Sequence, residues 1–406
     1  MKRILFLLIA LLLCSVALCA CGHTHEYGEW EQTVAPGCVS EGEEVRKCAC
    51  GESETRSVAA TGIHSFGKWK TLTAATCKKE GTEKRECACG ESELQTIPAL
   101  GRCDYDAWNI CKNCHEELVY TKGLAYTILE ENRATCQVTG PGVGNSTLTE
   151  LIIPPYIEGR RVVAVSGLGN NNALVSVTLP DTLKTIEERA FRGCTSLIDI
   201  VIPESVEQIG SWAFYECTSL QSVTFSEDCR IEVLEYRVFE GCSALCYFKI
   251  PESIRTIRRN TFDGCSSLRV LDKDIVYVDN WAVAWEYHGR EGLALRANTV
   301  GIAEYAFEGI GAAPFLVIPQ GVKYIGDYAL YNHLCETISI SKTVVSIGKQ
   351  AFGIGEALRK ATFEDPSGWT VSTTVDGEGT AVNLSSHTTN VTLLSSTYAD
   401  YYWRKG

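Results

Sequence analysis

The sequence predicts a repeat solenoid, mainly β with short helical turns, preceded by small Cys-rich β modules. Two observations lead to this prediction. A set of apolar residues recurs about every 23 residues from Leu174 onward, and a set of Cys, His and Trp residues recurs every 39 residues closer to the N-terminus. Length and composition agree, because 406 residues with 45% hydrophobic and 21% charged side chains are too many for one ordinary domain and too apolar for a disordered chain.

The first residues have the pattern of an export signal. Lys2 and Arg3 precede an apolar run that begins at Ile4 and ends in the small residues before Cys21. The motif Leu18-Cys19-Ala20-Cys21 resembles the lipobox of bacterial lipoproteins. By that resemblance, residues 1–20 are a lipoprotein signal peptide and Cys21 carries the lipid, so the mature chain is held to the outside of a membrane. Simple secretion and an uncleaved anchor are the alternatives.

Residues 21–118 contain tandem copies of a 39-residue unit. Residues separated by 39 positions are His25 and His64, Trp30 and Trp69, Cys38 and Cys77, Cys48 and Cys87, and Cys50 and Cys89. A third, degenerate copy places Cys103 at the His position and Trp108 at the Trp position. Each unit is too small to bury a self-sufficient core, so we expect it to be cross-linked or to lean on its neighbours.

The Cys and His residues of each copy suggest a structural metal. Tetrahedral zinc accepts three Cys and one His. The predicted sets follow the copies: His25, Cys38, Cys48 and Cys50; His64, Cys77, Cys87 and Cys89; Cys103, Cys111, Cys114 and His115. Disulfides, for example from Cys38 to Cys48 or Cys50, are an equally weighted alternative, and free thiols are a third. We expect no catalytic metal, because a closed site of four ligands leaves no open position, and no other cofactor.

The C-terminal period is nearly invariant over its first two copies. Apolar residues at every second or third position predict a short strand that a Pro ends, and an Ala-Phe pair predicts a compact turn. Nine positions recur 23 residues later: Leu174, Val177, Leu179, Pro180, Leu183, Ile186, Ala190, Phe191 and Cys194 match Leu197, Ile200, Ile202, Pro203, Val206, Ile209, Ala213, Phe214 and Cys217. Stacked turns should bury a column of Phe191, Phe214, Phe239 and Phe262, and a thiol ladder of Cys194, Cys217, Cys242 and Cys265.

These repeats, such as the run from Ile202-Pro203-Glu204 through Ala213-Phe214 to Cys217-Thr218-Ser219-Leu220, closely resemble the BspA-type leucine-rich repeat of bacterial surface proteins. The resemblance covers about residues 122–365. It implies an N-terminal cap over 119–173 and a leucine-rich repeat solenoid over 174–365. The polar, Thr/Ser-rich residues after Pro366, which end in Tyr and Trp residues, predict a C-terminal cap or tail over 366–406. The 39-residue units resemble short Cys-rich repeats near the N-termini of surface proteins of gut-type Gram-positive bacteria.

Members of the BspA-type family are chiefly surface adhesion and host-contact proteins. The resemblance therefore implies a non-enzymatic protein at the cell surface, membrane-anchored through its lipid, that binds an extracellular protein or glycan. A structural envelope component with a metal-stabilised Cys-rich spacer and no dedicated ligand is the alternative. The formal charge of −13 argues against nucleic acid as a partner.

Two surfaces are candidates for binding a partner. The repeat is interrupted at residues 271–300 by an insertion whose aromatic and polar side chains are of the kind that anchor interfaces: Trp281, Trp285, Tyr287 and His288. A hairpin with its own small core is the favoured alternative for these residues. The second surface is the solvent-facing row of strand positions Thr178, Val201, Thr224 and Lys249.

The sequence lacks the motifs of common enzymes. No nucleophile elbow, Cys and His catalytic pair or zinc-protease helix motif accompanies the seven His residues. The many carboxylates are dispersed as on a solvated surface. We therefore predict that the protein is not an enzyme.

Overall fold

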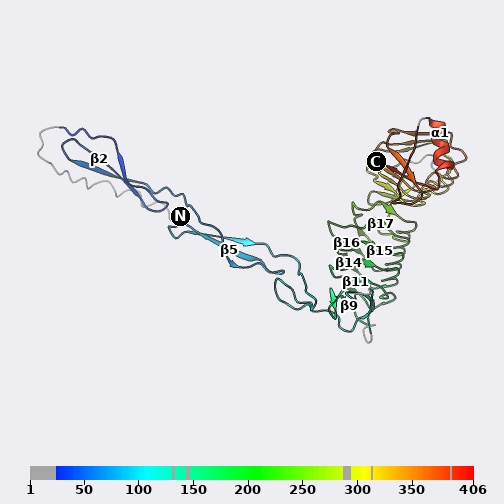
Figure 1. The fold of residues 1–406 in the computed structure, drawn as a ribbon, viewed down its shortest axis with the longest axis horizontal. Helices are drawn as coiled ribbons and strands as arrows, with labels where there is room; N and C mark the ends of the chain where they lie inside the picture. Colours follow the sequence, from blue (N-terminus) through cyan, green and yellow to red (C-terminus); the bar gives the residue numbers. More distant parts are fainter. Residues whose placement is uncertain (1–23, 130–132, 143–146, 287–293, 312–313, 385) are drawn as a thin grey trace, which may run out of the picture. The chain divides into compact units, whose positions relative to one another are not determined.

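The computed structural model describes residues 24–129, 133–142, 147–286, 294–311, 314–384 and 386–406. The chain divides into two compact units, Met1–Cys103 and Asp104–Gly406 (Figure 1). The predicted signal peptide and Cys21 lie outside the described residues. Within the described ranges, no helix combines the length and apolarity needed to cross a membrane.

The first unit consists of two small antiparallel sheets, one for each full copy of the 39-residue unit. The first sheet has the order β1 (Glu31–Val34), β2 (Gly42–Lys47), β3 (Ser53–Val58), and the second has the order β4 (Lys70–Thr73), β5 (Gly81–Glu86), β6 (Ser92–Ile97). All residues of β1 and β4 are exposed.

The Trp residues of these copies do not pack into a closed core. The Arg46 guanidinium lies 4.6 Å from the centre of the Trp30 ring, and Arg85 lies 4.7 Å from that of Trp69. Such cation–π contacts at exposed sites contribute only about 0.5–1 kcal/mol each. Each copy therefore needs a further source of stability.

The second unit is a solenoid of parallel strands. Figure 1 shows β9, β14 and β16 in that order along the coil. One side has the order β18 (Tyr247–Phe248), β16 (Ser222–Phe225), β14 (Asp199–Ile202), β12 (Ser176–Thr178), β9 (Glu150–Ile152). The other has β15 (Gln208–Ile209), β13 (Thr185–Ile186), β11 (Arg160–Val165), β8 (Thr135–Gly140), β7 (Ala125–Ile128), with β10 (Tyr156–Ile157) against β11.

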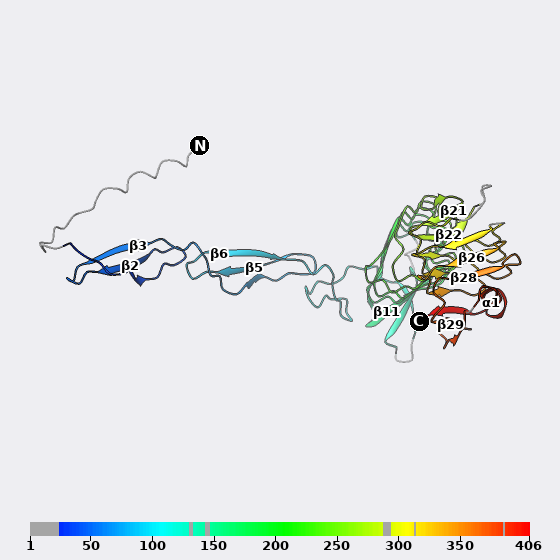
Figure 2. The same cartoon turned by 90° about the horizontal axis from the view of Figure 1, so that it is seen from above.

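The solenoid continues beyond β17 (Val233–Leu234), which pairs with β19 (Thr256–Ile257). Figure 2 shows β26 and β28 side by side, in the sheet β24 (Phe315–Ile318), β26 (Thr337–Ile340), β28 (Lys360–Phe363). The opposing sheet has the order β20 (Val270–Asp272), β21 (Ile275–Val278), β22 (Trp281–Trp285), β23 (Gly301–Ile302), β25 (Tyr324–Ile325), β27 (Ser346–Ile347), β31 (Tyr402–Lys405), β29 (Trp369–Ser372), β30 (Thr380–Ala381).

The predicted columns form. Phe191, Phe214 and Phe239 are fully buried and Phe262 is 3% exposed. Their rings stack nearly parallel, with centroids 5.3, 5.5 and 5.9 Å apart in chain order. The 23-residue period appears directly in the strand register, because Asp199 pairs with Ser222 and Ile200 with Val223. Identical positions of successive turns therefore lie one above the other, as the period predicts.

The thiol ladder has a hydrogen-bonding role that the sequence did not predict. Each of the four thiols is fully buried, and each lies within hydrogen-bonding distance of a carbonyl oxygen of the preceding turn. The thiol groups of Cys217, Cys242 and Cys265 donate to the carbonyls of Phe191, Phe214 and Phe239 at 3.2, 3.1 and 3.1 Å. The Cys ladder and the Phe column are thus linked from turn to turn.

Both ends of the solenoid change from parallel to antiparallel pairing. At one end β7 pairs antiparallel with β8, and at the other β31 pairs antiparallel with β27, placing Trp403 opposite Ile347. Trp403 is 1% exposed, so the C-terminal aromatic residues include part of the core. The short helix α1 (His387–Thr392) and the π-helical turn Leu393–Thr397 lie at this end, and Asn390 donates its side-chain N–H to the Ala361 carbonyl of β28 at 3.2 Å.

The insertion joins the solenoid instead of presenting its aromatic side chains. Strands β20, β21 and β22 form an antiparallel meander, and β22 pairs in parallel with β23. Trp281, predicted to be an exposed anchor, is 3% exposed and stacks on Tyr324 with ring centroids 6.0 Å apart. That prediction is wrong for Trp281, because its ring fills the space over Gly301, where a Cβ atom would clash with it. Trp285 is partly buried against the core, and Tyr287 and His288 lie outside the described residues.

Candidate metal centre

A tight turn presents two thiols in each full copy of the first unit. In the second copy, Cys87 donates its backbone N–H to the Glu91 carbonyl at 2.8 Å, and Gly90 donates back to the Cys87 carbonyl at 2.9 Å. Cys48 and Gly51 make the same pair of bonds in the first copy, Cys48 to the Glu52 carbonyl. Gly90 has a φ of +96°, a backbone region that suits glycine, so the Cys-Ala-Cys-Gly sequence is adapted to this turn.

The His residue of each copy lies against the second thiol of its turn. An isolated bridge pairs Tyr27 with Cys48, and another pairs Phe66 with Cys87, which brings the preceding His residue to the turn. The His25 Nδ1 atom is 3.1 Å from the Cys50 Sγ atom, and His64 Nδ1 is 3.2 Å from Cys89 Sγ. His25, Cys48 and Cys50 form one group of close ligand atoms.

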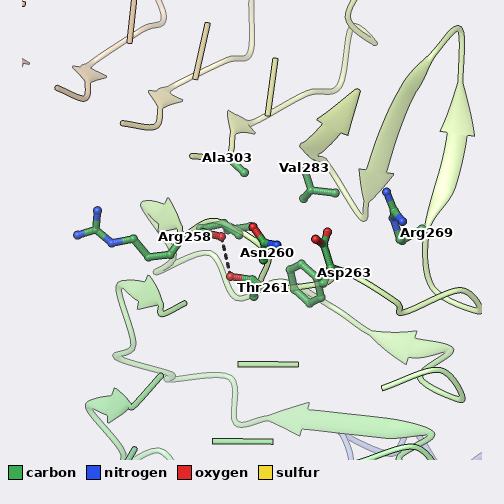
Figure 3. A pocket seen from close by; sticks show the side chains of 9 residues that line it. Arg258, Asn260, Thr261, Asp263, Arg269, Val283 and Ala303 are labelled. Carbon is green, nitrogen blue, oxygen red and sulfur yellow. Dashed lines mark hydrogen bonds between the residues drawn. The ribbon is translucent and has the colours of Figure 1, made fainter. Parts of the chain in front are cut away.

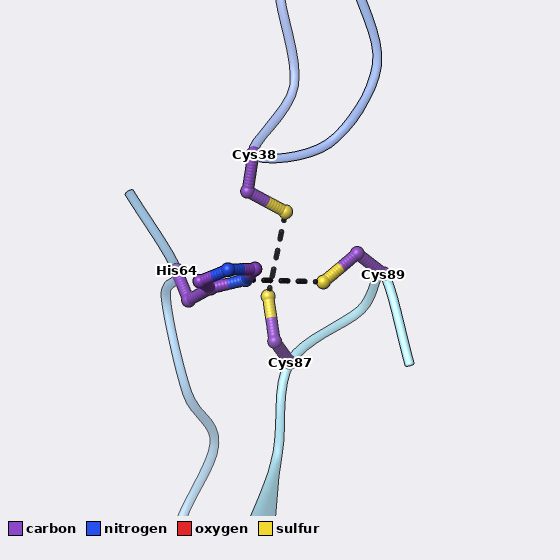
Figure 4. A group of neighbouring side chains, drawn as sticks. All are labelled: Cys38, His64, Cys87 and Cys89. Carbon is purple, nitrogen blue, oxygen red and sulfur yellow. Dashed lines mark hydrogen bonds between the residues drawn. The ribbon is translucent and has the colours of Figure 1, made fainter. Parts of the chain in front are cut away.

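Cys38 joins the second copy, and its predicted set is therefore wrong. The Sγ atom of Cys38 is 3.7 Å from that of Cys87, in a group with His64 and Cys89 whose ligand atoms all lie within 4.8 Å of one another (Figure 4). Cys77, predicted as the fourth member of that set, is replaced there by Cys38. The sequence prediction placed Cys38 and Cys77 differently because it grouped ligands by copy.

Backbone hydrogen bonds explain why Cys38 reaches the next copy. The segment after β3 folds back on the Cys38 loop, so that Thr61 donates to the Gly37 carbonyl at 2.9 Å and Gly62 to the Cys38 carbonyl at 3.1 Å. His64 follows two residues later. Cys77 makes the equivalent bond, since Gly101 donates to its carbonyl at 3.1 Å.

The surroundings favour the thiolate form of two of these Cys residues. The pKa of Cys87 falls to about 6, because the Cys89 backbone N–H and then His64 donate hydrogen bonds to its sulfur. The pKa of Cys48 falls to about 6 for the matching reason, through Cys50 and His25. The pKa of Cys38 rises to about 11 through its hydrogen bond with Cys89 and through burial. Thiolate is the form that binds metals.

The third predicted set is divided between the two units. Cys103 is the last residue of the first unit, whereas Cys111, Cys114 and His115 belong to the second. In the second unit Cys111 is fully buried, and the His115 N–H donates to the Cys111 carbonyl at 2.8 Å. His115 has a φ of +57°, so it sits at a left-handed turn.

The second unit has a small hollow beside the insertion. It lies between the turn Asn260–Asp263 and the residues Arg269, Val283 and Ala303, and the Thr261 hydroxyl donates to the Arg258 carbonyl at its edge (Figure 3). Its cavity volume is about 10 Å³, room for about one water molecule, so the hollow is too small for a small-molecule ligand.

Exposed strand positions form the row that the sequence predicts. Thr178, Val201, Thr224 and Lys249 are all exposed, while their neighbours Val177, Ile200, Val223 and Phe248 are buried. Val201 is 60% exposed, and Tyr247, which lies beside the row at the position paired with Ser222, is 64% exposed. On β24, Phe315 is 66% exposed in the same alternating pattern.

Comparisons with known proteins match the chain to bacterial leucine-rich repeat proteins. Solved structures similar to the chain include a leucine-rich repeat protein from Bacteroides ovatus (21% identity, 62% of this chain, 72% of that chain, TM-score 0.29), the pneumococcal vaccine antigen PcpA (17%, 62%, 82%, 0.32) and a leucine rich cell surface protein from Faecalibacterium prausnitzii (16%, 62%, 96%, 0.28). No curated protein matches the chain.

TM-scores this low carry no weight for fold or function, so the assignment depends on the repeats themselves. The model of the BspA type leucine rich repeat region matches residues 168–280 and 284–372, in six copies. These ranges contain the Phe column, the thiol ladder and the exposed row. The chain belongs to the family of BspA-type leucine-rich repeat proteins.

Proposed function

We propose that the protein is a non-enzymatic binding protein of the bacterial cell surface, whose solenoid engages an extracellular protein or glycan. A lipid on Cys21 holds the chain to the membrane, and the Cys-rich copies serve as a spacer between the membrane and the solenoid. The BspA-type family supports a surface location.

The exposed row on the solenoid supports the binding role. Val201, Tyr247 and Phe315 all point outward from strands of the solenoid, next to the buried residues Ile200, Phe248 and Leu316. Tyr and Phe are enriched at the centres of protein interfaces, and extended faces are where solenoids usually bind. These side chains expose apolar area to water and do not contribute to the core, which supports a role in contacting a partner.

Binding can be tested with the full chain and a variant of three outward strand residues, Val201, Tyr247 and Phe315. Purified protein would be presented to arrays of extracellular matrix proteins and of glycans, and to cell-wall fractions. We expect a ligand from the first two sources whose affinity falls at least tenfold in the triple variant Val201→Lys, Tyr247→Ala, Phe315→Ala. Leu334→Ala, an exposed residue outside the row, should leave the affinity unchanged. Binding confined to cell-wall fractions would instead support a structural envelope component.

Lipid anchoring needs a separate test, because Cys21 lies outside the described residues. Cells expressing the protein would be labelled with an alkyne fatty acid, which is detected after coupling to a dye. The wild-type chain should be labelled and remain with the membrane fraction, whereas Cys21→Ser should lose the label. Equal labelling of the two proteins would contradict lipidation at this residue.

A further inference from the structure

We propose that Cys38, His64, Cys87 and Cys89 bind one zinc ion that joins two consecutive copies of the Cys-rich unit. Their ligand atoms all lie within 4.8 Å of one another, although Cys38 belongs to one copy and the other three to the next. Three thiolates and one imidazole make a complete set for structural zinc, with no position left open for substrate. The ion would therefore act as a cross-link.

The distances within the group match a tetrahedral ion. Zinc–sulfur bonds of about 2.3 Å at tetrahedral angles place two sulfur atoms about 3.8 Å apart. The Sγ atoms of Cys38 and Cys87 are 3.7 Å apart, and His64 Nδ1 is 3.2 Å from Cys89 Sγ. A disulfide would need sulfur atoms only about 2.0 Å apart. The four side chains point toward a common centre in Figure 4.

Backbone hydrogen bonds hold the segments that carry the four ligands. Cys87 and Cys89 are held by the glycine turn after β5, and the two hydrogen bonds from Thr61 and Gly62 hold the Cys38 loop next to the segment that leads to His64. The ligands thus come from three separate segments, each positioned by its own backbone bonds. Such preorganisation reduces the ordering that metal binding would require.

The first unit needs a cross-link for stability because much of it is exposed to solvent. The strands β1 and β4 are exposed at every residue, so their sheets bury little apolar area. Small domains that cannot build a core commonly depend on a metal or on disulfides. A cross-link between copies would also limit bending at the segment that connects them.

The degenerate third copy is consistent with a ligand that each copy gives to the next. The third copy is shortened: the bridge of Tyr105 with Cys111 corresponds to that of Phe66 with Cys87, and no Cys lies between Tyr105 and Cys111, so the residue that corresponds to Cys38 is missing. A last copy has no successor and needs no such donor. Grouping within copies needs His115 as a replacement ligand to account for this loss.

Metal counting in double variants distinguishes the two groupings. Zinc would be measured by elemental analysis in the full chain, purified under reducing conditions and equilibrated with a fixed concentration of a competing chelator. We expect Cys38→Ser and Cys87→Ser each to lose one equivalent, and the double variant to lose the same one. Combining Cys38→Ser with Cys48→Ser should give the sum of the two single losses. Cys246→Ser, an exposed Cys of the solenoid, is the matched control and should lose none.

A conservative variant tests His64 without removing the ion. The third copy has Cys103 at this position, so His64→Cys should retain the metal. When cobalt replaces zinc, the d–d absorption bands of this variant should shift from those of a three-thiolate site toward those of a four-thiolate site. Unshifted bands would show that His64 is not a ligand.

Three results would overturn the proposal. The first is less than one equivalent of zinc in the reduced wild-type chain. The second is additive loss in the Cys38→Ser, Cys87→Ser double variant, which is the result that grouping within copies predicts. The third is a disulfide at Cys38, detected by mass spectrometry in protein purified without reductant, in place of the metal. None of these results bears on the binding role of the solenoid, which is tested separately.

Discussion

Replacing Phe214 by Ala tests the physical basis of the solenoid, its column of stacked rings. Phe214 is fully buried between Phe191 and Phe239, at centroid distances of 5.3 and 5.5 Å and interplanar angles of 6° and 8°. Truncation of a buried Phe to Ala costs about 3–5 kcal/mol, with the larger values where the cavity cannot collapse. The flanking turns are fixed here, because Phe214 donates its N–H to the Val238 carbonyl at 2.9 Å and accepts from the Cys242 thiol. We therefore expect a loss of about 4–5 kcal/mol.

The assay is equilibrium unfolding in urea, followed by far-ultraviolet circular dichroism of the full chain. Phe315→Ala is the matched control, since it removes the same atoms from a side chain that is 66% exposed. Surface substitutions usually change stability by less than about 0.5 kcal/mol. If Phe214→Ala lowers the free energy of unfolding by less than about 1 kcal/mol more than the control does, the column is not what holds the turns together.

Three further predictions concern single residues of the solenoid. His333 is fully buried, and burial lowers its pKa to about 4. The unfolded chain therefore binds more protons than the folded one, and the free energy of unfolding falls as the pH decreases from about 6.5 toward 4. His333→Leu should remove about 2–3 kcal/mol of the difference in unfolding free energy between pH 7 and pH 4.5, measured in urea, and an unchanged difference would refute this. Ile354 is 50% exposed and has a φ of +52°, a backbone region that strains any residue except glycine. Ile354→Gly should therefore stabilise the protein by about 1 kcal/mol in the same assay, whereas Val201→Gly on a strand should destabilise it. A loss of stability in Ile354→Gly would show that its backbone is not strained. Burial raises the pKa of the Cys217 thiol, so alkylation mapped by mass spectrometry should modify exposed Cys246 long before Cys217, and equal rates would show that the ladder opens readily.

The sequence predicts the solenoid well because the repeat length of the sequence is also the length of one turn of the solenoid. A residue and its counterpart 23 positions later occupy the same place in successive turns, so the apolar pattern identifies the columns and the strand register together. The apolar pattern does not predict the backbone conformation of the turns. Residues directly before the Ala-Phe pair have positive φ in turn after turn, as in Arg189, Trp212 and Tyr305, although none of them is glycine. The stacked neighbours hold these residues in a conformation that their own preferences disfavour.

Trp281 shows where composition misleads. An aromatic residue in an insertion is a reasonable interface anchor, but its ring lies against Tyr324, which is 43 residues further along the chain, and so no local pattern could reveal the contact. The sequence does contain one indication of this contact, Gly301, which lies opposite Trp281 on the neighbouring parallel strand. A glycine in a strand often marks a close approach by another group, and here that group is the indole ring.

The grouping of Cys38 shows a different limit, which concerns tandem repeats in general. A period establishes which residues are equivalent, but it does not establish whether an equivalent side chain faces its own copy or the next one. The two cases differ only at the ends of the array, because a ligand given to the next copy is not needed in the last. The absence of a Cys between Tyr105 and Cys111 is therefore the informative feature of the series. In an array of this kind, the imperfect terminal copy tells more about the direction of the cross-links than the perfect copies do.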